Sequence, residues 1–133
     1  MRIELIIRGM CSLYPGREGL SESISVVSII GQFLEHSRIF WFGNGGSPEV
    51  YIGSADWMSR NLDRRVEAVT PVEDPNLRSR LERLLELYLK DNRGAWDMQS
   101  DGSFIQRQPE EGEDVRNSQL QLIKQWSQGV LQS

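Results

Sequence analysis

A glycine-rich turn between two strand-forming runs is the feature that most constrains how this chain can fold. Residues 43–48 read Gly-Asn-Gly-Gly-Ser-Pro, and they separate the runs 38–42 and 49–53, which are rich in aromatic and β-branched residues. This pattern predicts a β-hairpin. Antiparallel pairing brings the start of the first strand and the end of the second to the same edge of a sheet. We therefore expect His36 and Ser54 to lie close together.

Short strand-like and helical runs make up the rest of the chain, which fits an α/β fold. The run 3–7 is nearly all apolar and indicates an interior strand buried on both faces. Asp74 and Pro75 open the clearest helix, with Asp74 as its N-cap. The other expected strands are 24–28, 64–69, 95–98 and 103–107, and the other expected helices are 29–35 and 115–126.

Arginine dominates the basic residues, of which only Lys90 and Lys124 are lysine. A guanidinium matches phosphate oxygens and never loses its charge, so this preference suits anion recognition, although genome base composition explains it equally well. The formal charge of −4, from 15 basic and 19 acidic residues, argues against general nucleic-acid binding.

The single cysteine, Cys11, excludes an internal disulfide and a cysteine metal cluster, and a buried structural thiol is the favoured interpretation. No apolar run approaches the roughly 18 residues that span a bilayer, and the chain does not start like a secretory signal peptide. We therefore expect one domain in the cytoplasm.

His36 is the only histidine in the chain and the first candidate for catalysis, although a lone histidine is more often structural. Imidazole titrates near neutrality and can attack phosphorus or move a proton. Ser54 can offer its hydroxyl and its amide to an oxyanion, and Gly53 allows close approach of the backbone to a ligand. Asp56 is either part of this site or an ordinary turn residue. Arginines that could bind a phosphate nearby are Arg8, Arg38, Arg60, Arg64 and Arg65.

Several strings of residues carry a family resemblance. His36-Ser37-Arg38 and Gly53-Ser54-Ala55-Asp56, followed by Arg60 and Glu67, resemble one half of the site of the phospholipase D superfamily. More closely, the run 6–75 resembles the C-terminal catalytic domain of bacterial polyphosphate kinase. The strings that carry this second resemblance are Arg8-Gly9-Met10-Cys11, Phe33-Leu34-Glu35-His36-Ser37-Arg38-Ile39, Tyr51-Ile52-Gly53-Ser54-Ala55-Asp56-Trp57-Met58 and Arg60-Asn61-Leu62-Asp63-Arg64-Arg65-Val66-Glu67.

The resemblance implies a phospholipase D-like α/β domain, with a central mixed β-sheet flanked by helices. It also implies an enzyme that reversibly moves the terminal phosphate of ATP onto polyphosphate, through a phosphohistidine in a preceding domain. We therefore expect residues 1–133 to be the C-terminal catalytic half-domain of a longer chain, and to be inactive alone. The expected partners are ATP, ADP, inorganic polyphosphate and the other domains of that polypeptide, with Mg²⁺ bound by ligands outside this chain. We expect the full-length enzyme to be a homo-oligomer, in the cytoplasm or at the surface of the inner membrane.

The resemblance also implies roles for single residues. His36 acts as general acid or base, or holds the transferring phosphoryl group, and Glu67 orients an active-site imidazole. Arg38 stands where the wider superfamily has lysine, and a guanidinium binds phosphate without shuttling protons, which favours kinase-like transfer over hydrolysis. The residues that bind ATP or phosphate are then Arg8, His36, Arg38, Ser54 and Arg60, and either Arg64 or Arg65 lines a polyanion channel.

Two other functions stay open. A homodimeric phospholipase D-like phosphodiesterase or nuclease would take one His36 from each subunit. A non-catalytic polyanion-binding module would use His36 only as a hydrogen-bond donor.

Overall fold

The computed structural model describes residues 1–56, 58 and 63–129. The chain divides into two compact units. The first unit comprises Met1–Leu34 and Glu86–Ser133, and the second comprises Glu35–Leu85.

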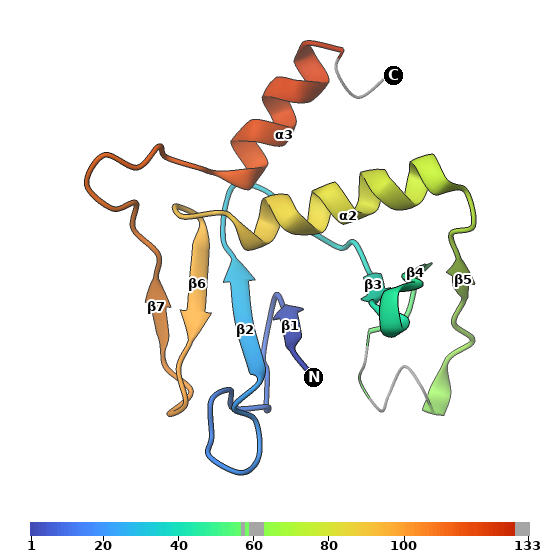
Figure 1. Ribbon diagram of the computed structural model, residues 1–133, viewed down its shortest axis with the longest axis horizontal. Helices are drawn as coiled ribbons and strands as arrows, with labels where there is room; N and C mark the ends of the chain where they lie inside the picture. The colour runs from blue at the N-terminus through green and yellow to red at the C-terminus, as the bar shows by residue number, and fades with distance from the viewer. Residues whose placement is uncertain (57, 59–62, 130–133) are drawn as a thin grey trace. The chain divides into compact units, whose positions relative to one another are not determined.

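The first unit contains a mixed four-stranded sheet (Figure 1). Its strands are β1 (Ile3–Ile6), β2 (Ile24–Ile29), β6 (Ala95–Met98) and β7 (Phe104–Gln106), in the order β1-β2-β6-β7. β1 and β2 are parallel, and the other neighbours are antiparallel. The apolar core of this unit lies along β2 and β6, at Val26, Val27, Ile29, Ala95 and Met98. The α/β class and the expected mixed sheet are confirmed.

Three predictions for this unit are wrong. Cys11 was expected to be buried but is only partly buried. β1 lies at the edge of the described sheet and has no fully buried residue, so it is not an interior strand. Residues 29–35 do not form a helix, because their backbone groups bond to distant segments instead of to one another. The Ile30 amide donates to the Gly94 carbonyl at 2.8 Å. The backbone of Phe33 is held by the Gln119 side chain.

The second unit contains a three-stranded antiparallel sheet of β3 (Ile39–Phe42), β4 (Glu49–Gly53) and β5 (Val69–Pro71). The expected hairpin is confirmed, with Phe42 opposite Glu49 next to the turn. The turn holds a short 3₁₀ segment, η1 (Asn44–Gly46), in which Gly45 and Gly46 have φ values of 63° and 102°. Glycine adopts such values without strain, which explains the composition of the turn.

The strand expected at residues 64–69 is wrong except for its last residue. β5 begins at Val69, which pairs with Gly53 of β4. The alternation that suggested a half-buried strand fails because Val66 is fully exposed. An alternating pattern gives a strand only where one face has something to pack against.

The two longest helices of the described residues each begin at a side-chain cap. α2 (Pro75–Leu89) starts where Asp74 Oδ1 accepts hydrogen bonds from the amides of Asn76 at 2.8 Å and Leu77 at 3.0 Å. The predicted N-cap is therefore confirmed. α3 (Ser118–Ser127) starts three residues later than residue 115, because the Asn117 side chain accepts from the Leu120 amide. Among the described residues, neither helix is long and apolar enough to cross a membrane.

A buried carboxylate joins three elements of the first unit. Asp91 is 1 % exposed, and its Oδ1 accepts hydrogen bonds from the amides of Arg93, Gly94 and Ala95 at 2.6–3.1 Å. Its Oδ2 accepts from the amide and the hydroxyl of Ser118, both at 2.7 Å. Burial, the largest single influence, raises the pKa of Asp91, but these hydrogen bonds outweigh it and hold the pKa below its ordinary value. Asp91 thus fixes the end of α2, the start of β6 and the start of α3 together.

Candidate functional site

The open end of the β3–β4 hairpin brings the predicted motif together within the second unit. Ile39 pairs with Ile52, and the Gly53 amide donates to the Arg38 carbonyl at 3.1 Å. The segments that carry His36 and Ser54 therefore leave the hairpin at the same end. The prediction that both residues lie at the same edge of the sheet is confirmed.

Arg38 is the centre of the hydrogen bonds at this end. Its Nε donates to Asp56 Oδ1 at 2.9 Å, and its Nη1 donates to the backbone carbonyl of His36, also at 2.9 Å. The bond to Asp56 raises the pKa of the Arg38 guanidinium, against the opposing effect of burial, and the charges of Asp56 and Glu67 act in the same direction as the bond. Asp56 is thus more than a turn residue. The hairpin register carries the signal for this pair, since Arg38 lies opposite Gly53 and Asp56 follows three residues later.

Ser54 uses its donors within the chain. Its hydroxyl donates to Glu67 Oε2 and accepts from the Ala68 amide at 3.1 Å, while its own amide donates to the Ala68 carbonyl at 2.9 Å. Ser54 would bind a phosphate only by giving up one of these bonds, so its direct phosphate contact stays a prediction. In this structure it ties Glu67 to the end of β4.

Gly53 is required for a backbone contact. A Cβ at this position would lie 2.9 Å from the Ala68 carbonyl oxygen and 3.0 Å from a Val69 methyl group. We expected this glycine to let the backbone approach a ligand, but the close neighbour is the chain itself, at the start of β5.

His36 presents an accessible imidazole. The residue is exposed, and within the described part of the chain its ring makes no hydrogen bond. Glu67 contacts Ser54, and the prediction that it orients an imidazole stays a prediction. The imidazole is therefore not sealed in an apolar core.

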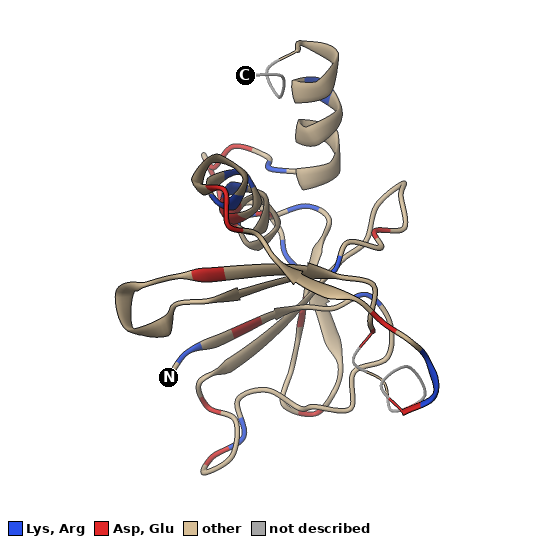
Figure 2. Cartoon of the chain, turned by 90° about the vertical axis from the view of Figure 1, so that its right-hand side faces the viewer, with Lys and Arg blue, Asp and Glu red and all other residues tan. Residues whose placement is uncertain are grey.

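The remaining candidate arginines lie elsewhere. Arg8 belongs to the first unit, is exposed, and precedes Gly9, whose φ of 121° turns the chain after β1. Arg64 and Arg65 are exposed in the second unit. Arg60 lies outside the described residues. Figure 2 shows basic and acidic residues interspersed along the described chain.

The charges around Arg38 bear on what this end of the hairpin can bind. Two carboxylates, Asp56 and Glu67, influence this one guanidinium. A multiply charged phosphate needs a net positive surrounding. Further cations must therefore join the site when it binds a phosphate chain. Among the described residues no group of three or more His, Cys, Asp or Glu side chains could hold a metal ion.

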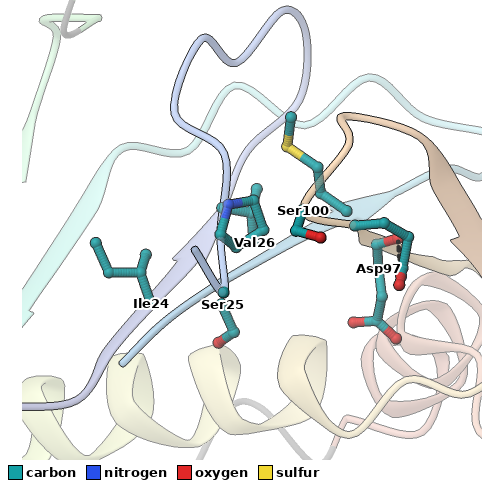
Figure 3. Close-up of a pocket in the computed structure, with 9 residues that line it drawn as sticks. Ile24, Ser25, Val26, Asp97 and Ser100 are labelled. Carbon is teal, nitrogen blue, oxygen red and sulfur yellow. Dashed lines mark hydrogen bonds between the residues drawn. The ribbon is translucent and has the colours of Figure 1, made fainter. Parts of the chain in front are cut away.

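A hollow of about 370 Å³ lies in the first unit, apart from the predicted residues of that unit. Figure 3 shows Ile24, Ser25 and Val26 of β2 and Asp97 and Ser100 of the next hairpin along its walls. The carboxylate of Asp97 is already held by two hydrogen bonds from Arg107, at 2.7 and 2.6 Å. The hollow therefore offers no free charged group from Asp97.

Comparisons with known proteins agree with one another. The family described as polyphosphate kinase C-terminal domain 2 matches residues 1–119. The chain is 96 % identical over 133 residues to a polyphosphate kinase of Parasynechococcus marenigrum (strain WH8102), which covers 100 % of this chain and 19 % of that protein. It is 50 % identical over 131 residues to a polyphosphate kinase of Pseudomonas aeruginosa, covering 98 % of this chain and 19 % of the relative.

A solved structure is also similar over nearly the whole chain. The crystal structure of polyphosphate kinase from Porphyromonas gingivalis matches with a TM-score of 0.90 and 38 % identity, over 99 % of this chain and 20 % of that one. The chain thus spans about a fifth of the length of the relatives that it matches.

Proposed function

The chain belongs to the polyphosphate kinase C-terminal domain family, and we propose that it is one catalytic domain of an enzyme that transfers phosphate between ATP and polyphosphate. The match of this family to residues 1–119 is the observation that carries the proposal. The exposed His36 beside Arg38 supports it, because phosphoryl transfer needs accessible groups that position the phosphate and neutralise its charge.

His36 serves the transferring phosphoryl group in this proposal. As the γ-phosphorus leaves the bridging oxygen of ATP and bonds to a histidine of another domain, the imidazole of His36 gives a proton or a hydrogen bond to oxygens that gain negative charge. In the second transfer the same ring assists as a terminal oxygen of polyphosphate replaces the histidine nitrogen at phosphorus. The exposed imidazole suits either task, since an imidazole ring can donate a hydrogen bond or transfer a proton.

Arginines supply the fixed positive charge. Arg38 binds the equatorial oxygens near His36, Arg8 binds nucleotide phosphates, and Arg60 also binds phosphate. Glu67 and Ser54 complete this end of the hairpin through their mutual hydrogen bond. Because Asp56 and Glu67 offset the charge of Arg38, the additional arginines are needed for a polyanion to bind.

The domain assignment follows from the length of the relatives. This chain matches about a fifth of each relative, and we assign residues 1–133 to the C-terminal catalytic half-domain of such an enzyme. The phosphohistidine and the ligands of Mg²⁺ then come from other domains of the polypeptide. The substrates are ATP, ADP and inorganic polyphosphate, and the full-length enzyme is a homo-oligomer in the cytoplasm or at the surface of the inner membrane.

Radiolabelled ATP tests the proposal. With Mg²⁺ present, we expect a full-length polyphosphate kinase that carries this chain to form acid-labile protein phosphate and polyphosphate. The 133-residue chain alone should form neither, and adding the upstream part should restore activity. Strong autophosphorylation of the chain alone would overturn the proposal. Hydrolysis of bis-p-nitrophenyl phosphate by a dimer of the chain would support a phosphodiesterase instead.

A further inference from the structure

The Arg38 guanidinium is fixed at two points by groups of its own unit. Asp56 accepts from Nε and the His36 carbonyl accepts from Nη1, each at 2.9 Å. The Arg38 side chain is 27 % exposed and that of Asp56 is 42 % exposed. Two bonds to different nitrogens of a planar group set both its position and the direction of its plane.

Fixing the plane leaves part of the guanidinium for a ligand. No described residue takes the Nη2 group, whose N–H bonds lie in the same plane. An anion that meets a guanidinium already held in place costs less ordering than one that must fix a mobile side chain. The same two bonds connect Asp56, through Arg38, to the main chain of His36.

An ion pair of this exposure contributes little to folding stability. Its geometry, in contrast, constrains the two residues for which a role in phosphoryl transfer is proposed above.

We infer that Asp56 is a positioning residue for phosphoryl transfer: by holding Nε of Arg38, it directs the guanidinium toward the phosphate on which His36 acts. This inference rests on the proposed function. Asp56 does not touch the substrate, and its negative charge weakens the attraction of the site for phosphate. The reaction needs the Asp56 oxygen that accepts the hydrogen bond from Nε of Arg38, and it does not need the negative charge of Asp56.

Two substitutions separate the oxygen from the charge. In a full-length polyphosphate kinase that carries this chain, Asp56→Ala removes the acceptor, and we expect kcat to fall by about tenfold to 100-fold, as for a misplaced catalytic group. Asp56→Asn keeps an acceptor oxygen and removes the charge. We expect it to retain kcat within about threefold and to lower KM for polyphosphate. Glu73→Ala, which removes an exposed carboxylate from the same unit, is the matched control and should change neither.

A double-mutant cycle tests whether Asp56 acts through Arg38. We expect Arg38→Ala and the double variant Arg38→Ala with Asp56→Ala to have the same kcat. A kcat of Asp56→Ala equal to that of wild type would overturn the inference. So would a double variant in which adding Asp56→Ala to Arg38→Ala lowers kcat by as much as Asp56→Ala does alone. Thermal unfolding of each variant shows whether a loss of kcat reflects loss of folding. If Asp56→Ala does not fold, Asp56→Asn is the decisive variant. A kcat of Asp56→Asn that is reduced more than about tenfold would then overturn the inference. An inactive wild type would overturn the proposed function itself.

Discussion

The residues of the candidate site differ in how far the sequence determined them. His36 and Arg8 stand in long strings of residues that resemble a known family, so both could be predicted as site residues from the sequence alone. The contact of Ser54 with Glu67 could not be predicted in the same way, because it joins two side chains 13 positions apart in the sequence. The same holds for Gly53, whose missing side chain makes room for Ala68.

Arg8 gives the clearest prediction at the residue scale. In a full-length polyphosphate kinase that carries this chain, we expect Arg8→Ala to raise KM for ATP by about tenfold or more and to reduce kcat less. The reason is that a guanidinium bound to nucleotide phosphates stabilises ground state and transition state alike. Steady-state kinetics measure both constants. Arg2→Ala is the control, since Arg2 is exposed in the same unit and pairs only with Glu4 among described residues. An unchanged KM for ATP in Arg8→Ala would contradict the assignment.

At the scale of elements, local signals succeeded where local forces decide the structure. The cap at Asp74 and the hairpin turn depend on residues within a few positions, and both were predictable. The helix expected at 29–35 failed because Ile30 and Phe33 bond to residues 64 and 86 positions away. Tertiary hydrogen bonds of this kind override helical periodicity and are not visible in a short window of sequence.

The buried Asp91 supports a prediction about stability. Both carboxylate oxygens of Asp91 accept hydrogen bonds, and Asp91→Asn replaces one of these oxygens with an NH₂ group, which cannot accept. The donors that faced this oxygen lose their acceptor, so we expect the free energy of unfolding to fall by about 2–4 kcal/mol. Urea unfolding of the 133-residue chain measures it. Asp114→Asn, which changes an exposed carboxylate of the same unit, is the control and should cost less than about 0.5 kcal/mol. Equal stability of the two variants would contradict the role of Asp91.

The same carboxylate predicts a pH dependence with a definite sign. Its pKa in the folded chain is below the ordinary value of about 3.9 that it regains on unfolding. Its contribution is therefore complete above about pH 5 and is lost as the pH falls through the folded pKa. Unfolding free energies measured between neutral and acidic pH should show a loss in wild type that Asp91→Asn lacks. A parallel loss in both proteins would assign the pH dependence to other carboxylates.

Gly31 and Gln119 lie next to each other, and this packing can be tested by mutation. Gln119 is 4 % exposed, accepts from the Phe33 amide at 3.1 Å and donates to the Phe33 carbonyl at 2.9 Å. A Cβ at Gly31 would lie 2.2 Å from Gln119 Oε1, so it would push the amide out of these bonds. We expect Gly31→Ala to cost about 1–3 kcal/mol in wild type and much less in a Gln119→Ala background. Additive costs in urea unfolding would contradict this account.

At the scale of the whole molecule, the composition of the chain says less about its function than its family membership does. Composition argued against general nucleic-acid binding, an internal disulfide and a cysteine metal cluster, and its arginine content had two explanations. The fold class and the mixed sheet are confirmed, but that the hairpin belongs to a second, separate sheet was not predicted from the sequence. The polyphosphate kinases that the chain matches are about five times its length. Roles that depend on residues of other domains can therefore be tested only in the full-length enzyme.

The most direct test of the account is the kcat for polyphosphate synthesis by a full-length polyphosphate kinase that carries this chain, with and without His36→Gln. Ser79→Ala, on the exposed surface of α2, is the matched control and should match wild type. We expect His36→Gln to lower kcat at least about 100-fold while the protein stays folded, because glutamine neither titrates nor transfers a proton at this position. A folded His36→Gln enzyme with the kcat of wild type would contradict the claim that this domain takes part in phosphoryl transfer through His36.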